Sequence, residues 1–245
     1  IVNEINLESF KKLLGDGREW GINISYSVQK SPDGLAQAFL IAEDFLGNSP
    51  SVLILGDNLY HGNDLGPQLI KANKDYDSST IFVYPVSDPE RYGVAEFKNN
   101  KVINLYEKPK EPKSKYAVTG LYFYDNTVVQ KAKTIKPSAR GELEITSLNN
   151  LYLQEDNLKV EVMGRGIAWL DTGTFDSLHQ AGTYIRVLER RQGLKVGCPE
   201  EVAWRKGWIN DNNLKDIANQ MIKSGYGKYL LEILNDPLKS QYNDI

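Results

Sequence analysis

The sequence predicts an α/β fold with a mixed, mainly parallel sheet flanked by helices. In the first third of the chain, short apolar segments alternate with helical patterns, and this order is typical of a doubly wound sheet. Residues 93–97 and 102–106 then alternate apolar and polar side chains around an Asn-rich turn, which indicates a β-hairpin. The length of 245 residues suits one large α/β domain or a domain with an appendage.

The first portion of the chain is expected to alternate helices and strands. The apolar run at residues 52–55 is too short for a helix and suits a strand buried on both faces. The turn-rich loop at 29–34 precedes a helix whose N-terminus offers free N–H groups to an anion or a base edge. The elements predicted here are a helix at 5–14, a strand at 22–28, a helix at 35–45, a strand at 52–55, a helix at 65–73 and a strand at 80–86.

The pattern changes twice more along the chain. Beyond the hairpin we expect a strand at 116–124, helices at 126–133 and 143–153, strands at 158–163 and 168–170, and a long helix at 175–191. After Gly193, short helices follow without strands, at 199–206, 213–223 and 229–234. The sequence therefore predicts an α/β domain over residues 1–193 and a helical C-terminal appendage over residues 194–245.

Composition narrows the class of protein. A net charge of −3 argues against a nucleic-acid-binding surface. No run approaches the ~20 apolar residues of a membrane span, and no signal peptide is recognised. The single cysteine, Cys198, excludes an intrachain disulfide and a cysteine-rich zinc site, and it fits a cytoplasmic protein. The two histidines, His61 and His179, do not lie in a recognisable nucleophile context.

Carboxylates stand where two of the predicted strands end. Asp57 follows the strand at 52–55, and Asp171 follows the strand at 168–170. Because open α/β sheets bind ligands at the carboxyl ends of their strands, the two carboxylates could share one Mg²⁺ that carries a phosphate. Two alternatives are that Asp57 caps a helix or turn near Asn58, and that Asp171 caps a helix beside Thr174.

Other strand ends suit a phosphorylated ligand rich in hydroxyl groups. Lys108 can meet a phosphate as a point charge. Tyr92, Gly93, Glu107 and Tyr122 can line a sugar, because carboxylates and backbone groups exchange hydrogen bonds with hydroxyls. The alternative for Glu107 and Lys108 is an exposed ion pair that contributes little.

Seven short motifs lie at residues 31–38, 55–58, 88–94, 107–109, 118–124, 140–146 and 169–174. In their order and spacing they resemble the glucose-1-phosphate thymidylyltransferase family of sugar nucleotidyltransferases. The resemblance runs from about residue 13 to residue 229, and residues 140–146 and 192–196 point to the thymidylyl branch. It implies a Rossmann-like nucleotide-diphospho-sugar transferase fold with a β-hairpin part that binds the sugar.

The resemblance also implies a reaction and roles for individual residues. Glucose 1-phosphate and dTTP give dTDP-glucose and pyrophosphate with Mg²⁺, as the first step toward dTDP-rhamnose. The catalytic residues implied are Asp57 and Asp171, as Mg²⁺ ligands, with Lys108 and Arg140 as cationic contacts to the sugar phosphate. The substrate-binding residues implied are Gln29 and Gly34 at the thymine, Asn58 beside the metal, and Tyr92, Gly93, Glu107, Val118 and Tyr122 around the glucose.

The family further implies an assembly and a second site. Its members are typically homotetramers with a regulatory nucleotide site at a subunit interface. By resemblance, the candidates for that site are Gly62, Arg165, Lys195 and Arg205. The alternative is that these residues are surface cations and a turn glycine.

One family feature has no counterpart in the sequence. Members begin with a glycine-rich loop that carries Gly-Thr-Arg and a following lysine, whereas this chain begins with Ile1 and Val2, which resemble the end of a strand. We therefore expect residues 1–245 as printed to catalyse the reaction poorly. Two alternatives stay open: a transferase that uses UTP or CTP, and a non-catalytic sugar-nucleotide-binding protein. Product formation from each nucleotide tests the first, and binding of dTDP-glucose without turnover would favour the second.

Overall fold

The computed structural model describes residues 1–75 and 77–237, which form two compact units. Unit 1 comprises residues 27–181 together with Ile1, and unit 2 comprises residues 2–26 and the described part of 182–245. Helix α7 (Phe175–Gln192) contains the division between them. The three helices expected after Gly193 are present in unit 2, which also holds the N-terminal helix α1 (Leu7–Leu14). The predicted domain boundary at residue 193 stays a prediction.

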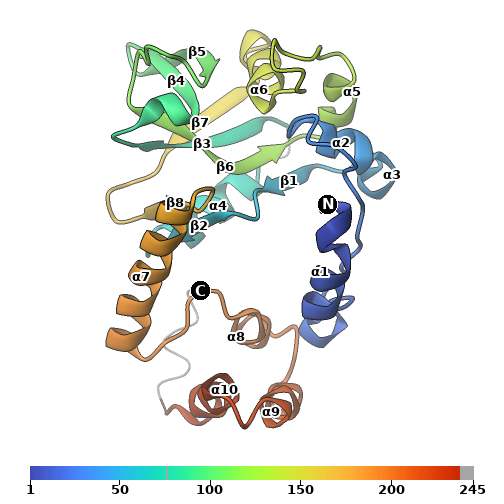
Figure 1. Ribbon diagram of the computed structural model, residues 1–245, viewed down its shortest axis with the longest axis vertical. Coiled ribbons are helices and arrows are strands. Elements are labelled where there is room, and N and C mark those ends of the chain that lie inside the picture. Colours follow the sequence, from blue (N-terminus) through green and yellow to red (C-terminus); the bar gives the residue numbers. More distant parts are fainter. Residues whose placement is uncertain (76, 238–245) are drawn as a thin grey trace. The chain divides into compact units, whose positions relative to one another are not determined.

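Unit 1 is built on a six-stranded mixed sheet in the order β5-β4-β6-β3-β7, with β1 also paired to β6 (Figure 1). Only β3 and β7 pair in parallel, and the other neighbouring pairs are antiparallel. The strands are β1 (Ser51–Ile54), β3 (Ser79–Pro85), β4 (Gly93–Lys98), β5 (Lys101–Glu107), β6 (Tyr116–Tyr124) and β7 (Leu158–Val162).

The expected mixed sheet with flanking helices is confirmed, but its neighbouring strands pair mainly antiparallel rather than mainly parallel. Strands β1, β3, β4 and β7 run one way, so most strands share a direction. Strand β6 runs against them and pairs with three of them, which makes most neighbouring pairs antiparallel. Its residues are almost all buried, which places β6 at the centre of the unit. Burial of its continuous apolar run is what the sequence pattern predicts for a central strand.

Two details of the expected strands are wrong. Strand β1 is formed but not buried on both faces, because Val52 and Ile54 are 44% and 62% exposed on the side turned away from the core. Residues 22–28 form no strand. Their polar atoms bond instead to the segment after α1: the Ile24 amide donates to the Asp16 carbonyl at 2.8 Å, and the Tyr26 hydroxyl donates to the Gly15 carbonyl at 2.6 Å.

A short two-stranded sheet stands beside the main one and was not expected in full. Strand β2 (Asn58–His61) pairs antiparallel with β8 (Ala168–Asp171). Asp57 lies in the tight turn between β1 and β2, where the Asn58 amide donates to the Leu55 carbonyl at 3.2 Å. The chain therefore continues from Asp57 as a strand rather than a helix. Of the alternatives considered for Asp57, the turn is found and the helix cap is not.

Helices cover both faces of the main sheet (Figure 1). One core contains Ile81, Val83 and Tyr122 under α2, α5 and α6, and the other contains Phe82 and Phe123 under α4. Successive residues of β3 and β6 thus enter opposite cores, as the period of two in a strand requires. The helix expected at 35–45 is divided at Ala42 into two. The helices are α2 (Gln37–Ile41), α3 (Glu43–Leu46), α4 (Leu65–Asn73), α5 (Val128–Ala132) and α6 (Ile145–Gln154).

The predicted hairpin of β4 and β5 is confirmed. Its turn residues Asn99 and Asn100 have φ values of 51° and 61°. Two successive left-handed residues are what a tight two-residue hairpin needs, and asparagine tolerates this conformation better than most residues. The pairing brings Gly93 opposite Glu107 at the far end of the hairpin.

Unit 2 has its own small core. It is formed by α8 (Pro199–Arg205), α9 (Asp211–Gln220) and α10 (Gly225–Asn235), with Leu214, Leu230 and Ile233 at its centre. Within the described residues, no helix is long and apolar enough to cross a membrane.

Candidate functional site

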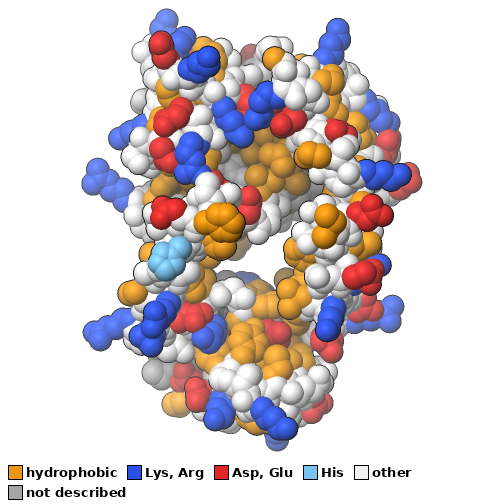
Figure 2. Space-filling view, in the orientation of Figure 1, with side chains coloured by type: hydrophobic (Ala, Val, Ile, Leu, Met, Phe, Trp, Pro, Cys, Tyr) orange, Lys and Arg blue, Asp and Glu red, His pale blue; other side chains and the backbone are white. Residues whose placement is uncertain are grey.

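A cavity of about 250 Å³ lies within unit 1 and gathers most of the residues that the sequence analysis selected. Hydrophobic side chains show in the hollow of this unit, with charged side chains of both signs around its rim (Figure 2). The predicted residues that line the cavity are Asp57, Asn58, Tyr92, Gly93, Glu107, Lys108, Val118, Tyr122, Arg140 and Asp171. These residues come from six separate stretches of the chain.

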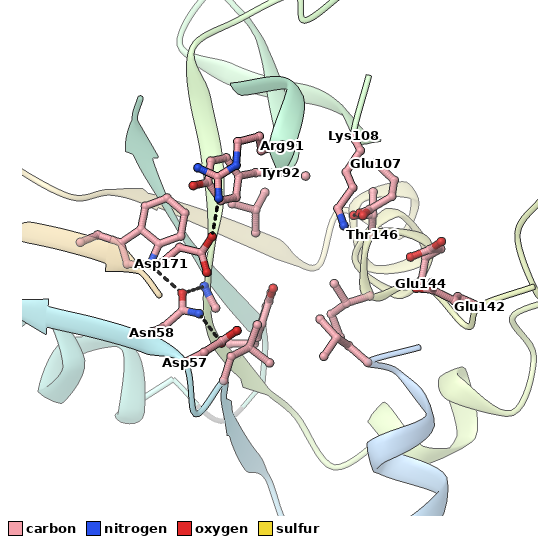
Figure 3. Close-up of a pocket in the computed structure, with 18 of the residues that line it drawn as sticks. Asp57, Asn58, Arg91, Tyr92, Glu107, Lys108, Glu142, Glu144, Thr146 and Asp171 are labelled. Carbon is pink, nitrogen blue, oxygen red and sulfur yellow. Dashed lines mark hydrogen bonds and ion pairs between the residues drawn. The ribbon is translucent and has the colours of Figure 1, made fainter. Parts of the chain in front are cut away.

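The acidic end of the cavity is organised by Asn58. The register of β2 and β8 places Asn58 directly opposite Asp171, so Asp57 adjoins the end of β8. The Asn58 Nδ2 donates to Asp57 Oδ1 at 2.9 Å, while its Oδ1 accepts from Trp169 Nε1 at 2.7 Å and from the Gly120 amide at 3.2 Å (Figure 3). A Cβ at Gly120 would come within 2.7 Å of Asn58 Oδ1, so this approach requires glycine.

The carboxylate oxygens at this end are ligands of the kind that suits Mg²⁺. Asp57 and Asp171 offer only oxygen, and the Thr172 amide and hydroxyl both donate to the Asp57 carbonyl at 2.8 Å, which ties their segments together. Among the described residues, no group of three or more His, Cys, Asp or Glu side chains could hold a metal. Mg²⁺ needs no such cage, because it usually takes one or two carboxylates together with waters and substrate phosphates.

Arg91 reaches the acidic end from the segment before β4. Its NH1 pairs with Asp88 Oδ2 at 2.9 Å and its NH2 with Asp171 Oδ2 at 3.2 Å (Figure 3). The guanidinium also lies over the ring of Tyr92, 5.2 Å from its centre. Partial burial raises the pKa of Tyr92 to about 12, so this phenol stays neutral at physiological pH.

The opposite end of the cavity is lined by β4, β5, β6 and α6. Glu107 is held by Thr146, whose hydroxyl donates to Glu107 Oε2 at 2.5 Å. A Cβ on Gly93 would meet Thr146 Oγ1 at 3.1 Å, so glycine keeps the space before Glu107 open. Val118 and the buried Tyr122 form the apolar part of the lining. A carboxylate beside bare backbone and an apolar wall can bind a sugar through its hydroxyls and its ring face.

Lys108 follows β5 in an unusual backbone conformation. Its φ is 40°, in the left-handed region that lysine rarely adopts, and its amide donates to the Tyr92 carbonyl at 3.0 Å. Strained residues of this kind concentrate at functional sites. The conformation ends the hairpin and leaves the Lys108 side chain on the lining of the cavity.

Arg140 is surrounded by three carboxylates. Its NH2 lies 2.9 Å from Glu144 Oε2, 3.2 Å from Glu142 Oε2 and 3.3 Å from Glu107 Oε1. Burial by itself would raise the pKa of Glu144, but hydrogen bonds from Arg140 and Ser138 more than offset it and hold that pKa below its usual value. Arg140 therefore keeps Glu144 ionised and remains 41% exposed to ligands.

Two predicted base contacts lie outside the cavity lining. The Gln29 Nε2 donates to the Gly34 carbonyl at 3.2 Å and to Gln37 Oε1 at 2.7 Å. Gly34 has a φ of 104°, and a Cβ there would lie 2.4 Å from the Leu143 carbonyl oxygen. The two residues thus shape one loop, which contributes Leu35 to the cavity. Their role at a nucleobase stays a prediction.

The four regulatory candidates do not line this cavity. In unit 1, Gly62 packs against Gly166, next to Arg165, and a Cβ on it would lie 2.4 Å from the Gly166 carbonyl oxygen. In unit 2, Lys195 pairs with Glu189 at 2.6 Å. Arg205 is not a surface cation, because its side chain is 2% exposed and its Nε bonds Glu201 Oε1 at 2.8 Å. The regulatory role of these residues stays a prediction.

Sequence reasoning missed about half of the lining. The missed residues are Leu35, Leu55, Arg91, Gly120, Glu142, Glu144, Ile145, Thr146 and Trp169. All of them lie inside the seven motifs, next to or within a few positions of a selected residue. The available signal was therefore the motif as a whole, since nothing in residue type distinguishes a lining Thr146 from a helix threonine.

Comparisons with known proteins identify the family of the chain. Residues 1–186 match the family described as Nucleotidyl transferase. The chain is 52% identical to glucose-1-phosphate thymidylyltransferase of Neisseria meningitidis, over 92% of this chain and 79% of that protein. It is 55% identical to the Mycobacterium tuberculosis enzyme of the same name, over 92% of this chain and 78% of that protein.

Solved structures give the same result. A crystal structure from Bacillus anthracis, assigned as a glucose-1-phosphate thymidylyltransferase in complex with a sucrose, superposes with a TM-score of 0.71 at 40% identity, over 81% of this chain and 78% of that chain. A UDP-glucose pyrophosphorylase complexed with UDP-glucose shares the fold at 22% identity with a TM-score of 0.62, over 76% of this chain and 78% of that chain. The chain belongs to the nucleotidyl transferase family, and within it to the glucose-1-phosphate thymidylyltransferases.

Proposed function

We propose that the protein transfers a thymidylyl group from dTTP to glucose 1-phosphate, giving dTDP-glucose and pyrophosphate in a Mg²⁺-dependent reaction. Relatives named for this activity share about half of their residues with the chain. The observation that carries the proposal is one cavity that has Glu107 and Gly93 at one end and the carboxylates Asp57 and Asp171 at the other. The product would lead toward dTDP-rhamnose, as the family implies.

The end of the cavity at Glu107 and Gly93 would select and orient the sugar. Glu107, fixed by Thr146, accepts hydrogen bonds from sugar hydroxyls, and the backbone around Gly93 can approach them because no side chain intervenes. Val118 and Tyr122 pack against the ring. Fixing the sugar fixes its phosphate, and orientation of this kind lowers the barrier by avoiding entropy loss during reaction.

No protein nucleophile is needed, because the sugar phosphate oxygen itself attacks the α-phosphorus while pyrophosphate leaves. The obstacle is repulsion between two polyanions, about 4 kcal/mol for unit charges ~4 Å apart at an effective dielectric near 20. Lys108 and Arg140 line the cavity and supply positive charge against this repulsion. Mg²⁺, held by Asp57 and Asp171, would add charge neutralisation and align the phosphates when bound.

The test measures pyrophosphate release with glucose 1-phosphate, Mg²⁺ and each of dTTP, UTP and CTP. We expect dTTP to be the preferred nucleotide, and Asp171→Asn to lower kcat/KM by about 100-fold or more. Asp156→Asn is the matched control, because Asp156 is exposed, lies outside the cavity and has a φ of 54° that asparagine tolerates.

Other outcomes would assign the activity differently. Preference for UTP or CTP would move the protein to another branch of the same chemistry. Tight binding of dTDP-glucose without turnover of any nucleotide would favour the non-catalytic sugar-nucleotide-binding protein.

We also infer that the protein assembles as a homotetramer, which the family's typical assembly supports. Sedimentation or light scattering gives the mass directly. A monomer at micromolar concentration would contradict the inference, and would also remove the subunit interface on which the regulatory role of Gly62, Arg165, Lys195 and Arg205 depends.

A further inference from the structure

The acidic end of the cavity already contains a cation that belongs to the protein. Arg91 pairs with Asp171 at 3.2 Å and with Asp88 at 2.9 Å, and it is among the residues that line the cavity. No proposed step in the transfer uses Arg91. Its guanidinium nevertheless contacts Oδ2 of Asp171, whose carboxylate would be offered to a divalent cation.

We propose that Arg91 competes with the divalent cation for Asp171, so that it holds this carboxylate in place before the metal binds and weakens metal binding until an anionic ligand enters. The inference rests on the proposed function, because it assumes that Asp171 is a ligand of the metal. Arg91 is thus a positioning residue for the metal site.

Competition follows from the partners of the Asp171 carboxylate. Its Oδ2 accepts from Arg91, and its Oδ1 accepts a longer bond of 3.3 Å from the Gly173 amide. A divalent cation binds a carboxylate oxygen at its lone pairs and carries charge of the same sign as the guanidinium. The ion and the guanidinium therefore repel each other at Asp171, and binding of one lowers the affinity for the other.

An incoming phosphate relieves the competition. Arginine binds phosphate by the same two-pronged geometry with which it binds carboxylates. Because Arg91 lines the cavity, a sugar phosphate there can attract the guanidinium and leave Asp171 to the metal. Metal and sugar phosphate should then each strengthen binding of the other through Arg91, since such coupling is reciprocal.

Asp88 sets how strongly Arg91 is committed to Asp171. It contacts the other terminal nitrogen at 2.9 Å, and the ring of Tyr92 lies beneath the guanidinium. Removing the charge of Asp88 leaves Asp171 as the carboxylate that pairs with Arg91 among the described residues. Asp88→Asn should therefore weaken metal binding, whereas Arg91→Gln should strengthen it.

The experiment measures Mn²⁺ affinity by electron paramagnetic resonance of the free ion, without nucleotide. We expect Arg91→Gln to lower the Kd for Mn²⁺ by about fivefold, as befits a partly exposed ion pair. The Kd of Arg91→Lys should lie between those of the natural protein and Arg91→Gln, because lysine keeps the charge but lacks the forked guanidinium. An unchanged or higher Kd in Arg91→Gln, with thermal unfolding unaltered, would overturn the proposal.

Two controls separate competition from a general effect of charge. Lys110→Gln removes an exposed positive charge from the same unit without touching Asp171, and it should leave the Kd nearly unchanged. A shift as large as that of Arg91→Gln would refute the specific role of Arg91. Asp88→Asn should raise the Kd in the natural protein and lose most of this effect in the Arg91→Gln background. Equal effects in both backgrounds would also refute it.

Addition of glucose 1-phosphate tests the second half of the proposal. It should tighten Mn²⁺ binding in the natural protein by a larger factor than in Arg91→Gln, and equal factors would overturn this coupling. Failure of the proposed function would look different: no nucleotide would release pyrophosphate, while Arg91→Gln would still tighten Mn²⁺. If Asp171→Asn leaves Mn²⁺ binding intact, the metal does not bind at Asp171 and the competition is excluded.

Discussion

Two arginines of this protein each form an ion pair with a glutamate four positions away in the chain, and their surroundings differ. Arg140 pairs with Glu144 in unit 1 and remains 41% exposed. Arg205 pairs with Glu201 in unit 2 and is 2% exposed. The first lines the cavity in which we propose that a sugar phosphate binds, whereas the second pairs with a glutamate that also bonds to Tyr229 of an apolar core. Accessibility, rather than residue type or spacing, separates a binding cation from a structural one.

The partners of the two glutamates sharpen this comparison. Glu201 is buried, and it also accepts a hydrogen bond from the Tyr229 hydroxyl. Glu144 accepts from Ser138 at 2.7 Å as well as from Arg140. Both carboxylates are therefore satisfied without a ligand. Arg140 has further acidic neighbours, Glu107 and Glu142, that an incoming anion could replace.

The largest expected effect is on the stability of unit 2. Arg205→Met should lower the free energy of unfolding by about 3 to 5 kcal/mol, because it leaves the Glu201 charge buried without its ion-pair partner. Chemical denaturation followed by circular dichroism measures this. Arg18→Met, a change at a highly exposed arginine of the same unit, is the control and should cost little. A loss as small as that of the control would mean that Arg205 is not structural.

For Arg140, the expected effect is on activity. Arg140→Met should lower kcat/KM by about 100-fold, because a cation that meets the phosphate is lost. Its free energy of unfolding should change by only about 1 kcal/mol, as is usual for partly exposed ion pairs. Steady-state kinetics and denaturation on the same sample separate the two effects. Full activity together with a loss of stability would show that Arg140 has a structural role, as expected for Arg205.

The contribution of Glu144 to stability should depend on pH. Its pKa lies below the usual 4.5 in the folded protein, so its ionised form stabilises the fold above the pKa of the unfolded chain. This contribution is lost as the pH falls through the lowered folded pKa. The difference in unfolding free energy between the natural protein and Glu144→Gln should therefore shrink between about pH 5 and pH 3. A difference independent of pH would show that Glu144 acts by packing alone.

The smallest expected effect concerns strain at the cavity. Lys108→Gly should raise the free energy of unfolding by up to about 1 kcal/mol, because glycine adopts a φ of 40° without the penalty that lysine incurs. The same variant should bind glucose 1-phosphate more weakly, which calorimetry measures. Lys110→Gly, at an exposed residue with no such φ, is the comparison and should not gain stability. A destabilised Lys108→Gly would mean that the lysine side chain compensates its own strain.

Short-range patterns in the sequence were sufficient to predict much of the fold. The strand at 116–124, the Asn-rich hairpin and the helix at 65–73 were predicted from apolar period and turn chemistry, because these signals act over a few residues. Burial was harder to predict. Val52 and Ile54 were expected inside, but a strand's face is covered only by whatever packs on it, and this is not encoded in its own apolar run.

The sequence by itself determined which motifs carry the chemistry, and the family to which they belong. Asp57, Lys108 and Asp171 could be selected because each follows a strand and lies in a motif of recognisable order. The tertiary structure alone decided which of the selected residues meet. Pairing of β2 with β8 sets Asn58 opposite Asp171. Packing of the folded chain brings Arg91 to the Asp171 carboxylate, 80 residues away in the sequence. Contacts of this range depend on register and packing, and for the same reason only the folded chain distinguishes Arg140, open to a ligand, from Arg205, enclosed in a core.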